Sequence, residues 1–142
     1  MSEERLSIAD YPLAEKRREI VRGKHGKSLD EITLEALLQD RVALEDLRIT
    51  AAALRQQAEI AESAGRGTLA ANFERGAELV DVPQDTIMRI YELLRPGRAQ
   101  SQEELLAVAL ELRDQYGAKG MAAFVEEAAE VYQRRGLFKK RF

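Results

Sequence analysis

The chain of 142 residues is long enough for one domain, and 45% apolar with 33% charged residues is typical of a globular protein with an ionised surface. It contains no Cys, which excludes disulfides, thiolate metal sites and a cysteine nucleophile, and its one His excludes most metal sites built from paired imidazoles. No run approaches the ~18 apolar residues of a membrane helix, and the N-terminus lacks the apolar stretch of a signal peptide. We therefore expect a cytoplasmic protein.

The net charge of −3 combines segments of opposite sign. Residues 16–27 hold six basic residues and one acidic residue, and residues 134–142 hold five basic residues and no acidic one. Residues 28–133 between them hold ten basic and twenty acidic residues. The two basic segments could bind nucleic acid or a membrane surface. We favour neutralisation by acidic groups of the chain itself or of a partner, because the acidic body would repel phosphate.

Residues 1–49 show little helical periodicity, and we expect an irregular N-terminal arm there. Gly23 and Gly26 bracket His25 in a loop that should be mobile unless a partner holds it. One or two short helices are expected in the arm, the first of them capped by Asp30. A segment with so little helix of its own needs the surface of a partner to become ordered.

Residues 50–142 are helical almost without a break, and we expect them to form the body of the protein. Thr50 is suited to cap the first helix, Asp81 the third, and Ser101 the fourth, in a capping box with Glu104. The expected helices cover residues 51–64, 67–80, about 82–95, 101–116 and 121–135.

The links and apolar faces of these helices predict how they pack. The short turn at residues 65–67 predicts that the first two helices form an antiparallel hairpin. The face of the last helix that is expected to be buried carries Met121, Phe124, Ala128, Val131 and Tyr132. No segment alternates as a strand does. The predicted fold is therefore all-α, a compact bundle of about five helices behind the irregular N-terminal arm.

Patterns that carry chemistry are missing from the sequence. There is no phosphate-binding GxxxxGK[ST] loop and no GxGxxG turn. Carboxylate pairs such as Glu74 with Glu78 lack the Glu-x-x-His partners of a di-metal bundle. His25 lies in a loop rich in Gly and Lys and is expected to be a surface residue. We expect no catalytic, cofactor-binding or metal-binding residue in this chain.

Runs of sequence along most of the chain resemble the small (gamma) subunit of adenosylcobalamin-dependent diol and glycerol dehydratases. In order, the runs are YPLA (11–14), KSLDEITLE (27–35), DLRIT (46–50), LRQQA (54–58), AESAGR (61–66), LAANFER (69–75), AEL (77–79), VP (82–83), IY (90–91), LRP (94–96) and AAFV (122–125). The similarity covers roughly residues 9–135. Together, these runs are far more specific than a short motif.

The resemblance implies an accessory role in a radical hydro-lyase. Members of this family assemble from large (alpha), medium (beta) and small subunits. The large subunit holds the substrate, and adenosylcobalamin lies between the large and medium subunits. An adenosyl radical starts the conversion of a 1,2-diol or glycerol to an aldehyde. The resemblance implies that the small subunit contacts the large one and supplies no catalytic residue.

The expected contact residues lie in the arm and at polar helix ends. They are Tyr11, Pro12, Leu13, Arg48, Arg66, Asn72 and Arg75. The alternative is a freestanding helical interaction domain whose basic arms bind nucleic acid or an acidic protein. The sequence leaves open the preferred diol, glycerol or amino-alcohol, a location within a bacterial microcompartment, and the oligomeric state of the isolated chain.

Overall fold

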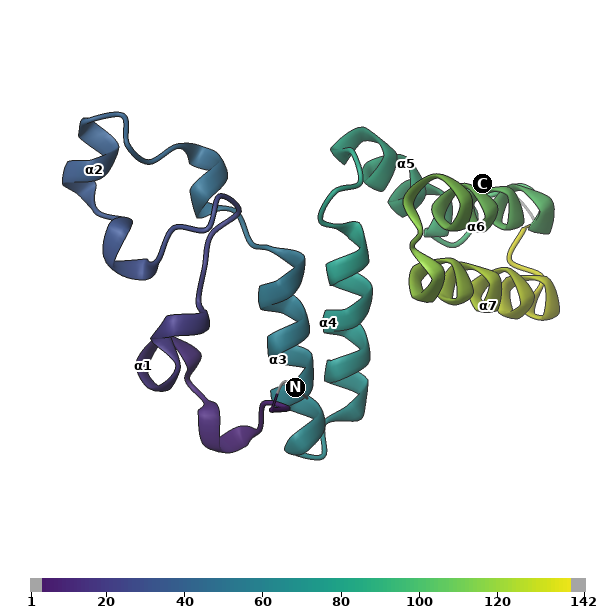
Figure 1. Cartoon of the computed structure of the whole chain (residues 1–142). Coiled ribbons are helices and arrows are strands. Elements are labelled where there is room, and N and C mark those ends of the chain that lie inside the picture. Colours follow the sequence, from purple (N-terminus) through teal and green to yellow (C-terminus); the bar gives the residue numbers. More distant parts are fainter. Residues whose placement is uncertain (1–3, 139–142) are drawn as a thin grey trace. The chain divides into compact units, whose positions relative to one another are not determined.

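The computed structural model describes residues 4–138, and its regular structure there is helical apart from one isolated antiparallel bridge between Arg22 and Ser28 (Figure 1). The all-α class is therefore confirmed. The elements are η1 (Ile8–Asp10), α1 (Leu13–Lys16), η2 (Arg18–Ile20), η3 (Leu29–Glu31), α2 (Leu34–Leu38), η4 (Leu44–Leu47), α3 (Ala51–Ser63), α4 (Gly67–Leu79), α5 (Gln84–Leu94), α6 (Gln102–Tyr116) and α7 (Lys119–Arg135), where η denotes a 3₁₀ helix. The last four residues of the basic C-terminal segment, 139–142, lie outside the described part of the chain.

The chain divides into two units, Met1–Val80 and Asp81–Phe142. The five long helices α3–α7 lie close to their expected positions, with α3 and α4 in the first unit and the other three in the second. The first unit keeps the N-terminal segment together with α3, on which it packs, and with α4.

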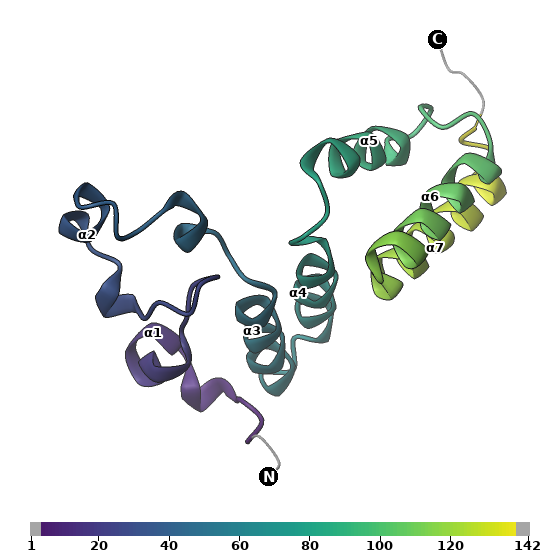
Figure 2. The same ribbon diagram turned by 45° about the horizontal axis from the view of Figure 1, so that its top comes forward.

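Helices α3 and α4 form the expected antiparallel hairpin, which Figure 2 shows side by side. The Thr50 hydroxyl accepts a hydrogen bond from the Ala53 N–H at 3.0 Å and begins α3 as predicted. Gly65 follows the end of α3 with a φ of +74°, a conformation that glycine adopts without strain. Small buried residues line the contact between the helices, namely Ala58, Ala61 and Ala70.

The N-terminal segment is anchored on α3 by hydrogen bonds and apolar packing. The Leu6 N–H donates to the Glu59 carboxylate at 2.9 Å, and the Ile8 N–H donates to the Ser63 hydroxyl at 2.7 Å. Leu6 and Leu13 pack with Ile60 of α3 in a buried cluster. This part of the expected arm therefore folds on its own chain.

Of three expected helix caps, the structure corrects two and confirms the third, Ser101. Asp30 does not cap α2, because it pairs with Arg18, and Thr33 caps the helix instead by accepting from the Ala36 N–H at 3.1 Å. Asp81 does not cap α5, which begins directly after the extended backbone of Pro83. Ser101 does accept from the Glu104 N–H at 3.4 Å, whereas the Glu104 carboxylate accepts from the backbone N–H of Gln100.

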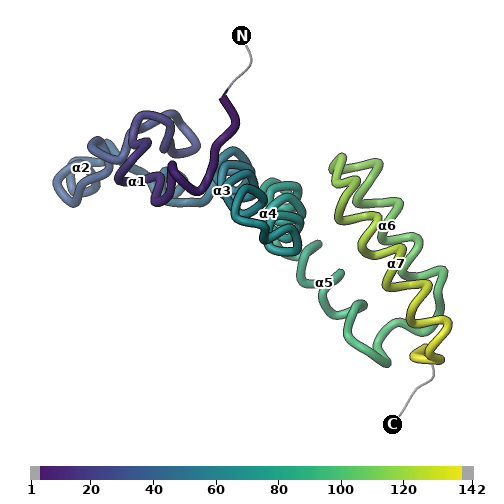
Figure 3. The backbone as a smooth tube through the Cα atoms, turned by 90° about the horizontal axis from the view of Figure 1, so that it is seen from below, coloured from purple at the N-terminus to yellow at the C-terminus, as the bar shows by residue number. Residues whose placement is uncertain are grey.

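The core of the second unit lies between α6 and α7, which run antiparallel and side by side (Figure 3). Leu105 and Leu112 of α6 and Val125 of α7 are fully buried. The expected buried face of α7 was wrong by one position, since Ala122, Val125 and Ala129 are buried, whereas Phe124 is 42% exposed. The physical reason is size: alanines on α7 let α6 approach closely, and the aromatic side chain is left outside.

No helix within residues 4–138 combines the length and hydrophobicity that are needed to cross a membrane.

Candidate subunit interface

The first unit carries a group of large apolar side chains that are exposed on α2, on η4 and in the residues next to them. We call this group the leucine surface. Three of its members are among the most exposed side chains, with Leu34 at 72%, Leu38 at 76% and Leu44 at 67% exposure. The complete set is Leu34, Leu37, Leu38, Leu44, Leu47 and Ile49.

The leucine surface is exposed because α2 turns its leucine face away from the interior of the unit. The sequence of this five-residue helix, LEALL, places leucines at positions 34, 37 and 38, a spacing that puts all three on one face of the helix. Only Ala36 of α2 is buried. In Figure 1, α2 lies away from the α3–α4 hairpin of its own unit. Several large apolar side chains exposed within one short segment are typical of protein interaction sites.

Asp46 holds η4 in place from within. Its side chain is buried, and the carboxylate accepts hydrogen bonds from the Ala43 N–H at 2.9 Å and from Lys27 Nζ at 3.2 Å. His25 Nδ1 lies 2.8 Å from the other carboxylate oxygen. The pKa of Asp46 is lowered from its usual value to about 2, mainly by the hydrogen bond from the Ala43 N–H and next by the hydrogen bond with His25. The ionised carboxylate therefore fastens the loop of His25 to the turn that carries Leu44 and Leu47.

The loop over residues 22–28 fits closely against this turn. The Gly23 N–H donates to the Lys27 carbonyl at 2.9 Å, and a Cβ atom at Gly23 would come within 2.9 Å of the Asp46 carbonyl oxygen. Glycine is therefore required at position 23 by a close approach of two backbone segments. The loop that was expected to depend on a partner is thus held by its own chain.

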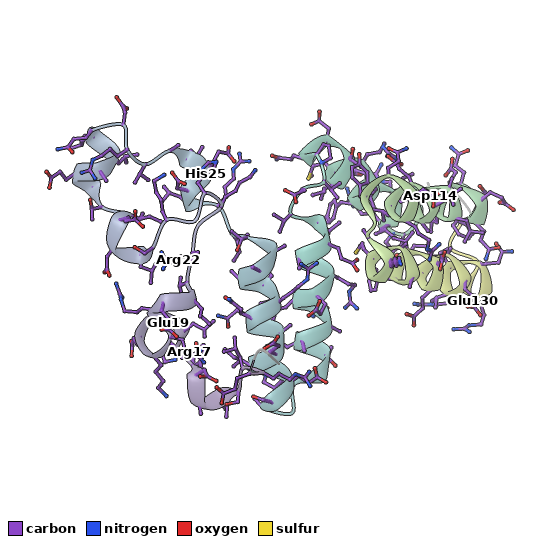
Figure 4. All side chains as sticks on the ribbon, viewed as in Figure 1. Arg17, Glu19, Arg22, His25, Asp114 and Glu130 are labelled. Carbon is purple, nitrogen blue, oxygen red and sulfur yellow. The ribbon has the colours of Figure 1, made fainter. Side chains whose placement is uncertain are left out.

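The basic residues of segment 16–27 are paired largely within the chain. Arg17 binds Asp10 at 2.9 Å and Glu19 at 2.7 Å, and Lys24 lies 3.8 Å from Glu45. Figure 4 shows Arg17 and Glu19 close together on the first unit. Hydrogen bonds from Arg17 lower the pKa of Glu19 and, after the backbone N–H of Ser7, that of Asp10. These acids neutralise much of the charge on which the nucleic-acid alternative depended.

A second feature of the first unit is an apolar hollow of about 330 Å³ near the α3–α4 turn. We call it the apolar hollow. Its lining is formed by Ile8, Tyr11, Gln57, Ile60, Ala61, Ala64, Arg66, Leu69 and Phe73. The N-terminal segment, α3 and α4 all contribute to it. Two of the expected contact residues, Tyr11 and Arg66, meet here.

The other expected contact residues lie elsewhere. Leu13 is 5% exposed and belongs to the interior of the first unit, and Pro12 directly precedes α1. Asn72 accepts a hydrogen bond from Arg75 on α4. Arg48 lies beside the leucine surface, where its guanidinium is 3.6 Å from the Glu45 carboxylate.

Sequence reasoning missed the leucine surface. The signal was present in the density of leucines within residues 34–49, together with the short expected helices that carry them. Two or three helical turns cannot bury six large apolar side chains unless other segments cover them. Within residues 4–138, no three imidazole or carboxylate side chains gather closely enough to hold a metal ion.

Comparison with known proteins identifies the family. The family model for the dehydratase small subunit matches residues 6–139. The propanediol dehydratase small subunits of Citrobacter freundii and Salmonella typhimurium are 51% and 52% identical to the chain over 132 residues. These matches cover 93% of this chain and 76% of each relative. The chain therefore belongs to the dehydratase small-subunit family.

Proposed function

We propose that this chain is the non-catalytic small subunit of an adenosylcobalamin-dependent diol or glycerol dehydratase and that it binds the large subunit through the leucine surface. The reaction is supported by the similarity to two propanediol dehydratase small subunits. The docking role is carried by one observation, the six large apolar side chains exposed over residues 34–49. Burial of each contributes about 1 kcal/mol or more to association.

Charge indicates what kind of surface the partner presents. Glu35, Asp40 and Arg41 lie among the exposed leucines, and none of the three forms an ion pair within the described residues, since Arg41 binds the neutral Gln39 side chain. The matching surface of the large subunit is therefore apolar, with a rim that carries charges of both signs. Such an arrangement steers association and selects the partner, while the leucines supply most of the affinity.

The proposal assigns the cofactor and the chemistry to the larger subunits. Adenosylcobalamin supplies the radical when it is bound there. The hollows of the first unit do not fit such a group, because they are open depressions that would not enclose it. We place the assembled enzyme in the cytoplasm.

Co-expression with the large and medium dehydratase subunits tests this function. Purification through a tag on this chain is expected to recover both larger subunits in stoichiometric amounts, with aldehyde formation from a diol that depends on added adenosylcobalamin. Larger subunits that are fully active without this chain, while the tagged chain purifies alone, would overturn the proposal.

A further inference from the structure

We propose that the apolar hollow receives an apolar side chain of the large subunit and that Arg66 binds a carboxylate next to that side chain in the sequence of the large subunit. This inference rests on the proposed function and adds a second contact, distinct from the leucine surface. The partner segment it describes is an aliphatic or aromatic residue beside an Asp or Glu.

The lining of the hollow selects the apolar part of this segment. Ile8 and Tyr11 are 60% and 55% exposed, and they extend the apolar lining out to the surface. Leu69 and Phe73, one turn apart on α4, form another wall. At about 330 Å³, the hollow lies at the small end of the range for ligand pockets and suits one or two side chains.

Arg66 is the one charged residue in this lining. Its guanidinium has no hydrogen bond or ion pair within the described residues, whereas Arg5, Arg17 and Arg18 of the same unit all bind carboxylates. An arginine fork binds a carboxylate through two parallel hydrogen bonds. An unpaired arginine beside an apolar hollow therefore matches an acidic group of a partner.

The start of α4 favours the same charge. Arg66 occupies the N-cap position of this thirteen-residue helix, and no side chain caps the helix there. The first N–H groups of α4 are thus left without a side-chain acceptor, and the helix dipole places partial positive charge at this end. A carboxylate bound to Arg66 would complete the helix terminus as well.

Charge reversal at Arg66 tests the ionic part of the contact. The Kd between the tagged chain and the co-purified larger subunits is measured at low and moderate salt. Arg66→Glu is expected to weaken binding roughly tenfold to a hundredfold, because an ion pair becomes a repulsion. Arg98→Glu, which makes the same charge change in the second unit, is expected to leave the Kd unchanged, and Arg66→Lys is expected to retain part of the affinity.

Filling the hollow tests the apolar part without changing the charge. Ala64→Phe places a ring in the hollow and is expected to weaken binding by a similar factor, whereas Ala107→Phe on the exposed face of α6 is not. Circular dichroism verifies that each variant remains helical. If Arg66→Glu and Ala64→Phe both bind like the wild type, the inference is wrong while the proposed function stands. If the wild type does not bind the larger subunits, both fail.

Discussion

Asp46 shows how one side chain organises a segment that has little regular structure. Among the described residues, Asp46 alone is a charged residue that is buried in the interior. A buried charge is tolerated only when it is hydrogen-bonded and paired. Two segments meet at its carboxylate, the loop through His25 and Lys27 and the turn through Ala43. The position of the leucine surface on η4 therefore depends on this one group.

The low pKa of Asp46 predicts an acid-sensitive contribution to stability. The pKa falls from 3.8 to about 2 on folding, so the ionised form stabilises the folded state above pH 4, and this contribution is lost as the pH falls through 2. Urea unfolding between pH 2 and pH 6 should show that Asp46→Asn is less stable than the wild type, by a difference that shrinks below pH 4. For Glu130→Gln, an exposed carboxyl group, a pH-dependent difference of the same size would contradict this account.

Two glycines of the first unit are predicted to respond to alanine with opposite signs. Gly23→Ala should destabilise the fold by about 1–3 kcal/mol, because the new Cβ atom meets the Asp46 carbonyl oxygen at 2.9 Å. Gly76→Ala should stabilise it by about 0.5–1 kcal/mol, because this helical position has only the Leu54 side chain nearby, at 3.7 Å. Chemical denaturation of both variants measures the two signs, and equal effects would show that the close approach at Gly23 is unimportant.

At the scale of elements, the packing of α6 on α7 sets the stability of the second unit. Leu112→Ala removes a fully buried side chain and should cost about 2–5 kcal/mol of unfolding free energy. Leu110→Ala on the exposed face of the same helix should change it by less than about 0.5 kcal/mol. Thermal unfolding, followed by the circular dichroism signal of α-helix, measures the loss of stability in both variants. Similar losses would show that the core of the second unit does not lie at Leu112.

The long helices could be predicted from sequence because their signals are local. Thr50 and Gly65 mark the two ends of α3, and apolar residues that recur every three or four positions identify α4–α7. The buried face of α7 could not be predicted in the same way. Met121, Phe124 and Ala128 follow helical spacing as well as Ala122 and Val125 do, and the choice between the two faces depends on the partner helix.

The candidate interface was predicted only in part, for a related reason. Tyr11 and Arg66 were identified because they lie in the arm and at a polar helix end, and the fold brings them together at the apolar hollow. The leucines of α2 and η4 resemble core residues in any local pattern. Their exposure follows from which other segments reach them, and a distant contact of that kind cannot be read from periodicity.

At the scale of the whole molecule, the leucine surface is predicted to control association. The triple variant with Leu34, Leu38 and Leu44 changed to serine should bind the larger subunits at least about a hundredfold more weakly, at about 1 kcal/mol for each leucine. In isolation, the wild-type chain should self-associate as its concentration rises, and the variant should not. Sedimentation velocity measures both effects. A matched loss of binding in Leu106→Ser/Leu110→Ser, which removes two exposed leucines of α6, would show that the surface is wrongly assigned.

The Asp46 contacts have a consequence for the turnover of the protein in the cell. They hold the apolar side chains of η4 outward in a folded chain, so a copy without its partner displays them continuously rather than during rare unfolding. Chaperones and proteases act on exposed apolar segments. Unassembled copies would then be removed faster than assembled ones, and the abundance of this chain would follow the supply of the subunit that covers it.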